Sequence, residues 1–319
     1  MLSHLTPSKN VVVTGGAGFI GSHVVRELLA AGYTVAVVDN LSSGYRHNLP
    51  DAGEAFHELD IRDADLGPVM AGASSVVHLA ALVSVPLSIE NPELNAAINI
   101  HGTERVFEAA RAAGVRRVVY ASSAAVYGDA PGLPKRETDP PAPQSPYAEA
   151  KLANELVAAR LAQVYGLESV GLRFFNVFGE RQDPSSMYSG VISIFADRLQ
   201  AGKGITVFGD GEQTRDFVDA SDVARAVRLC LEREAPGSGE ELRKVFNVGR
   251  GEQVSLLQLI KTLNQLLGTS VEPSFEPARP GDIKHSLADV TPLVSWTGWS
   301  AEVDLPQGLS RLFDSSSLD

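Results

Sequence analysis

Tyr147 and Lys151 are the first residues whose types and spacing could do chemistry, because they stand four positions apart in the segment SPYAEAK. Prolines precede this segment and Ser145 is a suitable N-cap, so the sequence predicts a helix through AEAKLANELVAARLAQVYG. Residues four apart share one helix face, which would place an ammonium beside a phenol. A packed tyrosine beside a solvated lysine is the commoner outcome for so short a motif.

A second chemical signal lies in the first forty residues. Residues 11–13 form a β-branched run suited to a buried strand, glycines follow at 15, 16, 18 and 21, and a helical pattern runs to Leu29. TVAVVD then predicts a second strand that ends at Asp39. Glycines let a backbone approach a pyrophosphate at a helix N-terminus, and an acid at this distance accepts hydrogen bonds from an adenosine ribose. The unit therefore predicts a dinucleotide site, and the Asp39 carboxylate favours NAD because it would repel the 2′-phosphate of NADP.

Strands and helices continue to alternate up to residue 175. The predicted strands are AFHELDI, SSVVHLAA, RRVVYASS and LESVGLRFFN, and helical stretches such as PELNAAINIHGTERVFEAARAAG separate them. Repeated βαβ units predict an α/β fold with a Rossmann-type, doubly wound parallel sheet. Ligands bind beyond the carboxyl ends of such strands, which makes the residues there candidates for the site: Asp60, Ala80, Ala81, Ser122 and Ser123.

After residue 175 the pattern loosens into loops rich in glycine, proline and aspartate. These loops separate helices such as VISIFADRLQAG and SLLQLIKTLNQLLG, which predicts a smaller C-terminal α/β domain over the site. We expect an NAD-binding Rossmann domain at residues 1–175, with 217–248 returning to it, and a substrate domain formed by 176–216 and 249–319.

Composition excludes several classes of function. The net charge of −12 argues against nucleic acid or an anionic membrane surface as a partner. The single cysteine, Cys230, lies in a helical pattern and is expected to be a buried structural thiol. The seven histidines show no metal-ligand spacing, so we expect no metal. No signal segment or long apolar stretch is present, which predicts a cytoplasmic protein.

Ten motifs in order give the chain a family resemblance over nearly its whole length. They are TGGAGFIG, VVDN, LDI, HLAA, NIHGT, SSAAVYG, SPYAEAK, RFFNVFG, TRDFVDASDVA and RPGDIKHSLAD. The chain resembles the extended short-chain dehydrogenase/reductase family, specifically its nucleotide-sugar epimerases. This resemblance changes the interpretation of Tyr147 and Lys151, which now look catalytic.

The resemblance implies a base, a cation and a hydroxyl for oxidising a sugar alcohol to a ketone. Tyr147 would take the hydroxyl proton, and Ser123 would bond the sugar oxygen and relay that proton. A free phenol has a pKa of about 10, so we expect Lys151 and the positively charged nicotinamide to lower it. Lys151 would also hold the nicotinamide ribose. Family members that dehydrate or decarboxylate typically carry an acid two places after the catalytic hydroxyl, where this chain has Ala125, so epimerisation is favoured.

The resemblance also implies the remaining contacts. For NAD they are Gly15, Gly18, Phe19, Ile20, Gly21, Asp39, Asn40, Ser43, Gly44, Asp60, Ile61, Leu79, Ala80, Ala81, Asn99, Ser122, Tyr147, Lys151 and Phe174. For a UDP-sugar they are Ser84, Ser123, Tyr147, Asn176, Val191, Arg215, Arg279, Asp282 and Ser286. Arginine forks suit phosphate oxygens, and a carboxylate suits a ribose diol.

Ser286 bears on the choice of sugar. In this family the position seven residues beyond the diphosphate-binding arginine, here Arg279, lies against the C2 substituent. Enzymes confined to plain hexoses resemble one another in having tyrosine there, whereas those that accept N-acetyl sugars have a small residue. Ser286 therefore leaves room for an acetamido group, and Ser84 and Ser88 offer further small polar groups.

These observations together predict an NAD-dependent 4-epimerase of UDP-hexoses that works through a 4-keto sugar. The expected pairs are UDP-GlcNAc with UDP-GalNAc and UDP-glucose with UDP-galactose. The alternatives are a UDP-glucuronate epimerase, another NAD-dependent nucleotide-sugar enzyme, or a binding module that keeps only the fold. Family members pair as four-helix dimers, and Ala96, Ala97, Val106, Ala109 and Ala110 would allow such packing, so a homodimer is expected.

Overall fold

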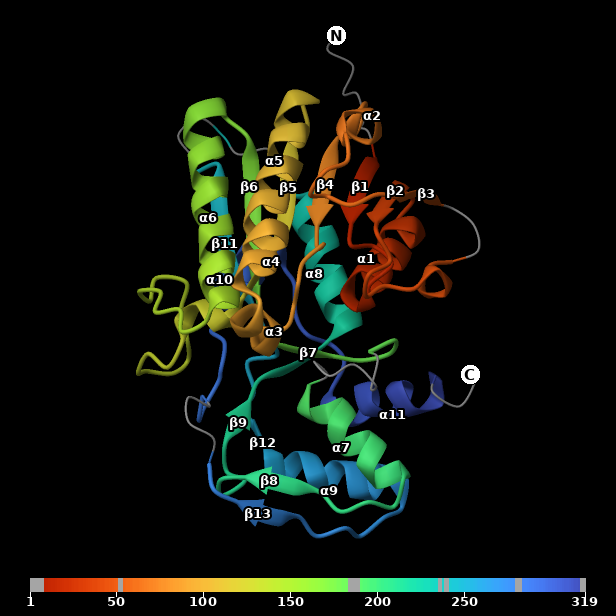
Figure 1. Ribbon diagram of the computed structural model, residues 1–319, viewed down its shortest axis with the longest axis vertical. Helices are drawn as coiled ribbons and strands as arrows, with labels where there is room; N and C mark the ends of the chain where they lie inside the picture. The colour runs from red at the N-terminus through yellow and green to blue at the C-terminus, as the bar shows by residue number, and fades with distance from the viewer. Residues whose placement is uncertain are drawn as a thin grey trace.

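The computed structural model describes residues 9–50, 54–182, 190–234, 237, 241–278 and 283–315. It has two lobes, a larger one built on a parallel sheet and a smaller one that faces one edge of that sheet (Figure 1). The larger lobe holds most of the residues before 175, and the smaller lobe consists of segments from both sides of residue 217.

The larger lobe contains a seven-stranded sheet in the order β11-β6-β5-β4-β1-β2-β3, and every neighbouring pair is parallel. The strands are β1 (Asn10–Thr14), β2 (Thr34–Asp39), β3 (Glu54–Glu58), β4 (Ser75–His78), β5 (Arg117–Ser123), β6 (Glu168–Phe174) and β11 (Arg243–Val248). This confirms the predicted doubly wound Rossmann-type sheet. Each predicted strand formed, with its ends shifted by a few residues.

Helices cover both faces of the sheet, and alternate residues of one strand show this directly. Val119 of β5 packs into the apolar core shared with α1 (Phe19–Ala30) and α8 (Ala220–Glu232). Its neighbours Val118 and Tyr120 pack into a second core with the helices of the other face. Successive strand residues point to opposite faces, so the middle of a strand buried on both sides is apolar at consecutive positions.

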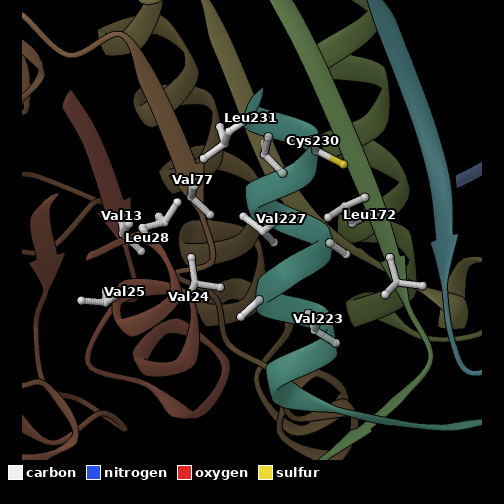
Figure 2. Close-up of a cluster of buried hydrophobic side chains, with 14 of the residues drawn as sticks. Val13, Val24, Val25, Leu28, Val77, Leu172, Val223, Val227, Cys230 and Leu231 are labelled. Atoms are coloured by element: carbon white, nitrogen blue, oxygen red, sulfur yellow. The ribbon is translucent and has the colours of Figure 1, made fainter. Parts of the chain in front are cut away.

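Figure 2 shows the core between β1, α1 and α8, where Val13, Leu28 and Val227 lie close to one another. Cys230 belongs to the same cluster and has no exposed surface. Burial raises the pKa of its thiol to about 12, so the thiol stays protonated. The prediction of a buried structural cysteine is confirmed.

The second face carries two long helical segments. One is continuous from α4 (Pro92–Asn95) through η2 (Ala96–Gly102) to α5 (Thr103–Ala112), and the other is α6 (Pro146–Tyr165). The predicted helix over 92–114 therefore formed, but its middle is a seven-residue π-helix. Of two short helices, α2 (Gly67–Met70) lies in the connection between β3 and β4, and α3 (Val85–Glu90) lies between β4 and α4.

The smaller lobe has its own apolar core and three two-stranded sheets. Its strands pair as β7 (Asn176–Phe178) with β10 (Phe217–Asp219), β8 (Thr206–Phe208) with β13 (Ser274–Glu276), and β9 (Thr214–Arg215) with β12 (Val254–Ser255). Its helices are α7 (Val191–Gln200), α9 (Leu256–Leu267) and α11 (Leu305–Ser315), while α10 (Thr291–Thr297) lies beside β11. Of residues 217–248, which were expected to return to the Rossmann domain, α8 packs against the large sheet and β11 joins it, whereas β10 pairs with β7 and not with the large sheet.

Candidate active site

The carboxyl ends of the parallel strands meet at the edge that faces the smaller lobe (Figure 1). Most predicted NAD contacts lie at this edge because they end a strand, follow one or begin the next helix. They comprise the turn and first residues of α1 (Gly15, Gly18, Phe19, Ile20, Gly21), the residues at and after the end of β2 (Asp39, Asn40, Ser43, Gly44), those after β3 and β4 (Asp60, Ile61, Leu79, Ala80, Ala81), and those ending β5 and β6 (Ser122, Phe174).

The turn between β1 and α1 requires glycine. Gly15 has φ +72°, and a Cβ there would lie 2.5 Å from the backbone nitrogen of Ala80. A Cβ on Gly21 would lie 2.0 Å from the Gly15 carbonyl oxygen. Gly18 is the N-cap of α1 and supplies no side-chain acceptor, so an anion can approach the N–H groups of the first turn. This cradle fits the pyrophosphate of a dinucleotide.

Asp39 lies beside the same turn at the end of β2. Its Oδ2 accepts a hydrogen bond from Ala17 N at 2.9 Å, and its Oδ1 accepts one from Leu41 N at 2.9 Å. Burial raises the pKa of Asp39, and the two backbone donors oppose that rise. A fixed anionic acceptor beside the glycine turn suits a ribose diol and disfavours a 2′-phosphate.

A second acid, Asp60, lies after the neighbouring strand. Asn40 Nδ2 donates to its Oδ2 at 2.7 Å, and Arg62 binds both oxygens at 3.0 and 2.8 Å. The Arg62 guanidinium holds the pKa of Asp60 well below its usual range. Because Arg62 is engaged by this carboxylate, it is not oriented to receive a 2′-phosphate.

Ser123, Tyr147 and Lys151 come together where β5 ends and α6 begins. Ser145 N-caps α6, as predicted, by accepting from Ala148 N at 3.2 Å. Lys151 is buried, its Nζ donates to the Ala121 carbonyl at 3.1 Å, and the same Nζ lies 5.7 Å from the centre of the Tyr147 ring. Ser123 ends β5, and its Oγ accepts from Ala125 N at 3.2 Å.

Burial dominates the electrostatics of this group. Burial raises the pKa of the Tyr147 phenol, and interaction with the Ser123 hydroxyl only opposes that rise. Burial lowers the pKa of the Lys151 ammonium to about 8. In the polypeptide alone, desolvation of the phenolate keeps the pKa of Tyr147 above its ordinary value. The expected lowering by Lys151 together with a bound nicotinamide stays a prediction.

Two side chains that the sequence argument did not assign to this task hold the start of α6. Ser88 Oγ accepts from the backbone nitrogen of Tyr147 at 3.2 Å, and Asn95 Nδ2 donates to the Pro146 carbonyl at 2.9 Å. Asn99 donates to Asn95 Oδ1 at 2.7 Å and bonds both backbone groups of Leu82. These bonds fix the backbone at Tyr147 and the loop after β4.

The serines near the predicted sugar position are engaged locally. Ser84 N-caps α3 by accepting from Leu87 N at 3.0 Å, and Ser88 donates to the Val85 carbonyl at 2.6 Å. Both are buried. Ser88 therefore acts on Tyr147 through its backbone, and contact of Ser84 with a sugar stays a prediction.

A buried ion pair connects α6 to β6 one helical turn beyond Lys151. Glu155 on α6 accepts from Arg173 Nε at 2.9 Å and from Arg173 Nη2 at 2.8 Å. It also accepts from Ser122 Oγ at 2.6 Å, so the hydroxyl next to Ser123 is directed toward α6. Glu155 follows Lys151 by four residues, and an acid on the buried face of a predicted helix was the signal for this role.

The predicted UDP-sugar residues fall mostly in the smaller lobe. Asn176 begins β7, Val191 begins α7 and Arg215 ends β9. Ser286 N donates to the Thr214 carbonyl at 3.2 Å, so Ser286 lies beside the residue that precedes Arg215. Arg279 and Asp282 lie outside the described residues.

Asp216 lies among these residues and was not singled out from the sequence. Its carboxylate accepts three backbone N–H groups from two separate loops. Burial raises its pKa to about 6, even though those donors lower it. The sequence TRDFVD contained a signal, since an aspartate directly before a buried apolar strand must find partners when it is itself buried.

Two structural checks bear on other classes of protein. In the ranges that the structure describes, no group of His, Cys, Asp and Glu side chains could hold a metal ion. None of the described helices is both long and apolar enough to cross a bilayer.

Comparison with known proteins identifies the family. The model of the NAD dependent epimerase/dehydratase family matches residues 11–249. The chain is 40% identical over 307 residues to a UDP-glucose 4-epimerase of Mycolicibacterium smegmatis, covering 94% of this chain and 96% of that protein.

Two solved structures share the whole fold. One is a UDP-N-acetylglucosamine 4-epimerase from Methanobrevibacter ruminantium in complex with UDP-N-acetylmuramic acid, with a TM-score of 0.92, 36% identity, and coverage of 98% of this chain and 99% of that one. The other is a UDP-glucose 4-epimerase from Thermotoga maritima with UDP-glucose, with a TM-score of 0.89, 38% identity, and coverage of 97% and 100%. These similarities confirm the resemblance to nucleotide-sugar epimerases. The chain belongs to the NAD dependent epimerase/dehydratase family and is an isomerase whose cofactor is NAD.

Proposed function

We propose that the protein is a 4-epimerase of UDP-hexoses that interconverts UDP-GlcNAc with UDP-GalNAc and UDP-glucose with UDP-galactose. The observation that carries this proposal is the grouping of Ser123, Tyr147 and Lys151 at the carboxyl end of β5. In that group a phenol interacts with a serine hydroxyl, and a buried ammonium lies 5.7 Å from the ring centre. The glycine turn and Asp39 beside it are the residues that would hold NAD.

The chain's own residues move a proton and hold the sugar. Tyr147 takes the proton from O4 as the C4 alcohol becomes a ketone, and Ser123 bridges O4 and the phenol. The Lys151 ammonium, 5.7 Å from the ring centre, would favour the phenolate and would hold the nicotinamide ribose. When bound, NAD supplies a hydride acceptor and donor together with a positive ring charge, which favours the phenolate against the burial described above.

The residue at position 125 favours epimerisation over elimination. Ala125 occupies the place where an eliminating enzyme needs an acid or base, and its backbone N–H only supports Ser123. The ketone then returns to an alcohol as Tyr147 gives its proton back to O4, and bound NAD would supply the hydride that C4 needs. The residues that hold UDP, including Asn176 and Arg215 and also Arg279 and Asp282 outside the described ranges, would retain the nucleotide while the keto sugar turns over.

Ser286 sets the sugar range in this proposal. It is a partly exposed side chain next to Thr214. A serine leaves space there for the sugar's C2 acetamido group, whereas a tyrosine would fill that space and exclude the group. Names among the similar proteins include both N-acetyl and plain hexose epimerases, which supports the wider range. A UDP-glucuronate epimerase is the remaining alternative.

Replacing Ser286 with Tyr tests this assignment. The variant should lose turnover of UDP-GlcNAc and UDP-GalNAc while it keeps turnover of UDP-glucose and UDP-galactose. Ser310→Tyr on the exposed side of α11 controls for the added phenol. Equal loss of both activities, or loss of neither, would show that Ser286 is not the gate.

We also propose a homodimer through the outer side of α5 and α6. Leu156, Val164 and Tyr165 are exposed apolar side chains on α6, and covering them would be favourable. Two of the residues expected at the dimer interface from the sequence, Val106 and Ala110, are instead buried against the chain's own sheet. A partner could contact Ala96, Ala97 and Ala109, which are partly exposed.

A further inference from the structure

Asp216 is a fully buried acid that no catalytic step uses. It lies between β9 and β10, and its Oδ1 accepts from Arg250 N at 2.6 Å. Its Oδ2 accepts from Gly251 N at 3.0 Å and from Ala288 N at 2.9 Å. One carboxylate therefore joins two loops that are far apart in the sequence.

The second of these loops carries Ser286. Thr214 N donates to the Lys284 carbonyl at 2.9 Å, and Ser286 N donates to the Thr214 carbonyl at 3.2 Å. Ala288 N follows two residues later and donates to Asp216. The strand that contains Arg215 thus holds the Ser286 segment by alternate residues. The Asp216 carboxylate adds a side-chain acceptor to these bonds, and Thr214 Oγ1 lies 3.1 Å from His285 Nδ1 of the same segment.

Asp216 also contacts the third predicted nucleotide-binding segment. Its backbone carbonyl accepts from Asn176 N at 3.0 Å. Asn176, Arg215 and Ser286 come from three separate stretches of chain. Asn176 donates to the Asp216 carbonyl, Arg215 directly precedes Asp216, and Ser286 lies two residues before Ala288, which donates to the Asp216 carboxylate.

The packing around Asp216 leaves little freedom. A Cβ on Gly249 would lie 2.7 Å from Asp216 Oδ2 and 2.8 Å from the Ala288 side chain. The φ of Gly249 is not positive, so a residue with a Cβ is excluded there by this close approach and not by backbone conformation. The contact between Asp216 and Ala288 therefore depends on a glycine that faces both.

We propose that Asp216 is a positioning residue for UDP-sugar recognition, whose carboxylate fixes the Ser286 segment relative to Arg215 and Asn176. The inference rests on the proposed function for the roles of those three residues. Asp216 itself does not touch the sugar in this account. It sets the separation of the groups that do.

Three variants remove the connection in different ways. Asp216→Ala removes all acceptors and leaves buried N–H groups without partners. Asp216→Asn keeps one acceptor oxygen and should give a smaller effect. Gly249→Ala keeps the carboxylate but presses a methyl group between it and Ala288, so it tests the geometry without removing the charge.

Asp222→Asn is the matched control. Asp222 is also a buried aspartate that accepts backbone N–H groups, from Glu302 at 3.0 Å and from Val303 at 2.9 Å. Those residues lie in the C-terminal segment, not in the Ser286 segment. Its loss should lower the melting temperature without changing UDP affinity.

The main measurement is the dissociation constant for UDP, determined by calorimetry. The melting temperature, the amount of bound NAD, and the kcat and KM for UDP-GlcNAc and UDP-glucose are measured for the same variants. We expect Asp216→Ala and Gly249→Ala to weaken UDP binding about tenfold or more and to change the KM ratio of the two sugars, while kcat at saturation and bound NAD are retained. If Asp216→Ala does not fold, Gly249→Ala and Asp216→Asn carry the test.

Unchanged UDP affinity in the folded variants would overturn the inference, and so would equal weakening by Asp222→Asn, since that would indicate a merely structural role. UDP affinity separates this inference from the proposed function. If Ser286→Tyr shows that Ser286 is no gate, weakened UDP binding still supports the role of Asp216 toward Arg215 and Asn176.

Discussion

Glu155→Gln should destabilise the protein strongly, because Glu155 and Arg173 form a buried, doubly bonded ion pair. The two bonds are 2.9 and 2.8 Å, and each side chain is only 4% exposed. Replacing the carboxylate by an amide leaves the guanidinium without a counter-ion and removes the charged acceptor of Ser122 Oγ. Breaking a buried pair by changing one partner costs about 3–5 kcal/mol.

That loss is a large part of the roughly 5–15 kcal/mol by which folded domains are stable. Urea unfolding followed by far-ultraviolet circular dichroism at neutral pH measures it. Glu108→Gln is the control, because Glu108 pairs with Arg111 at 2.7 Å on the surface and its loss should leave the unfolding free energy unchanged. A Glu155→Gln variant as stable as Glu108→Gln would refute the reasoning that burial, and not distance, sets the cost.

Three further predictions concern the cofactor, the lysine and assembly. Cofactor released from the denatured protein should be mainly NAD, because Asp39 is anionic and Arg62 is engaged by Asp60; mainly NADP, read by enzymatic cycling, would contradict this. Burial holds the pKa of Lys151 near 8 in the folded chain, against an ordinary value of 10.5. Between these two pH values the unfolded chain binds more protons than the folded chain, so the unfolding free energy should rise as pH increases from 8 to 10. Urea titrations of the cofactor-free protein should show a flatter rise for Lys151→Met, and parallel curves would disprove the assignment. Light scattering at micromolar concentration should give a dimer that Leu156→Lys weakens, whereas a monomeric wild type would dispose of the dimer.

The fold could be predicted closely because local patterns determine it. The glycine turn between Val13 and Leu29, the strand ending at Asp39 and the cap at Ser145 each depend on residues close in sequence. Parallel pairing then follows from the alternation of strands and helices. The π-helix at Ala96–Gly102 was not predicted, because its apolar pattern is also compatible with an α-helix.

Side-chain partners were harder to predict than backbone elements. Glu155 and Arg173 are 18 residues apart, and Asp216 and Ala288 are 72 apart, so no local pattern connects them. The pKa of Tyr147 in the polypeptide alone was hard to predict for a similar reason. Spacing on a helix shows that Lys151 is near, whereas the desolvation that raises the pKa of Tyr147 depends on packing from the whole chain.

The most direct test of the central claim is epimer formation by the wild type and by Tyr147→Phe. UDP-GlcNAc and UDP-glucose are each incubated with the purified protein, and the C4 epimers are resolved by chromatography. The wild type should form both epimers, and Tyr147→Phe should retain bound NAD while its turnover falls by about 10² to 10⁴, the usual contribution of a general acid–base group. A Tyr147→Phe variant with near wild-type turnover, or a wild type that forms neither epimer, would contradict the account.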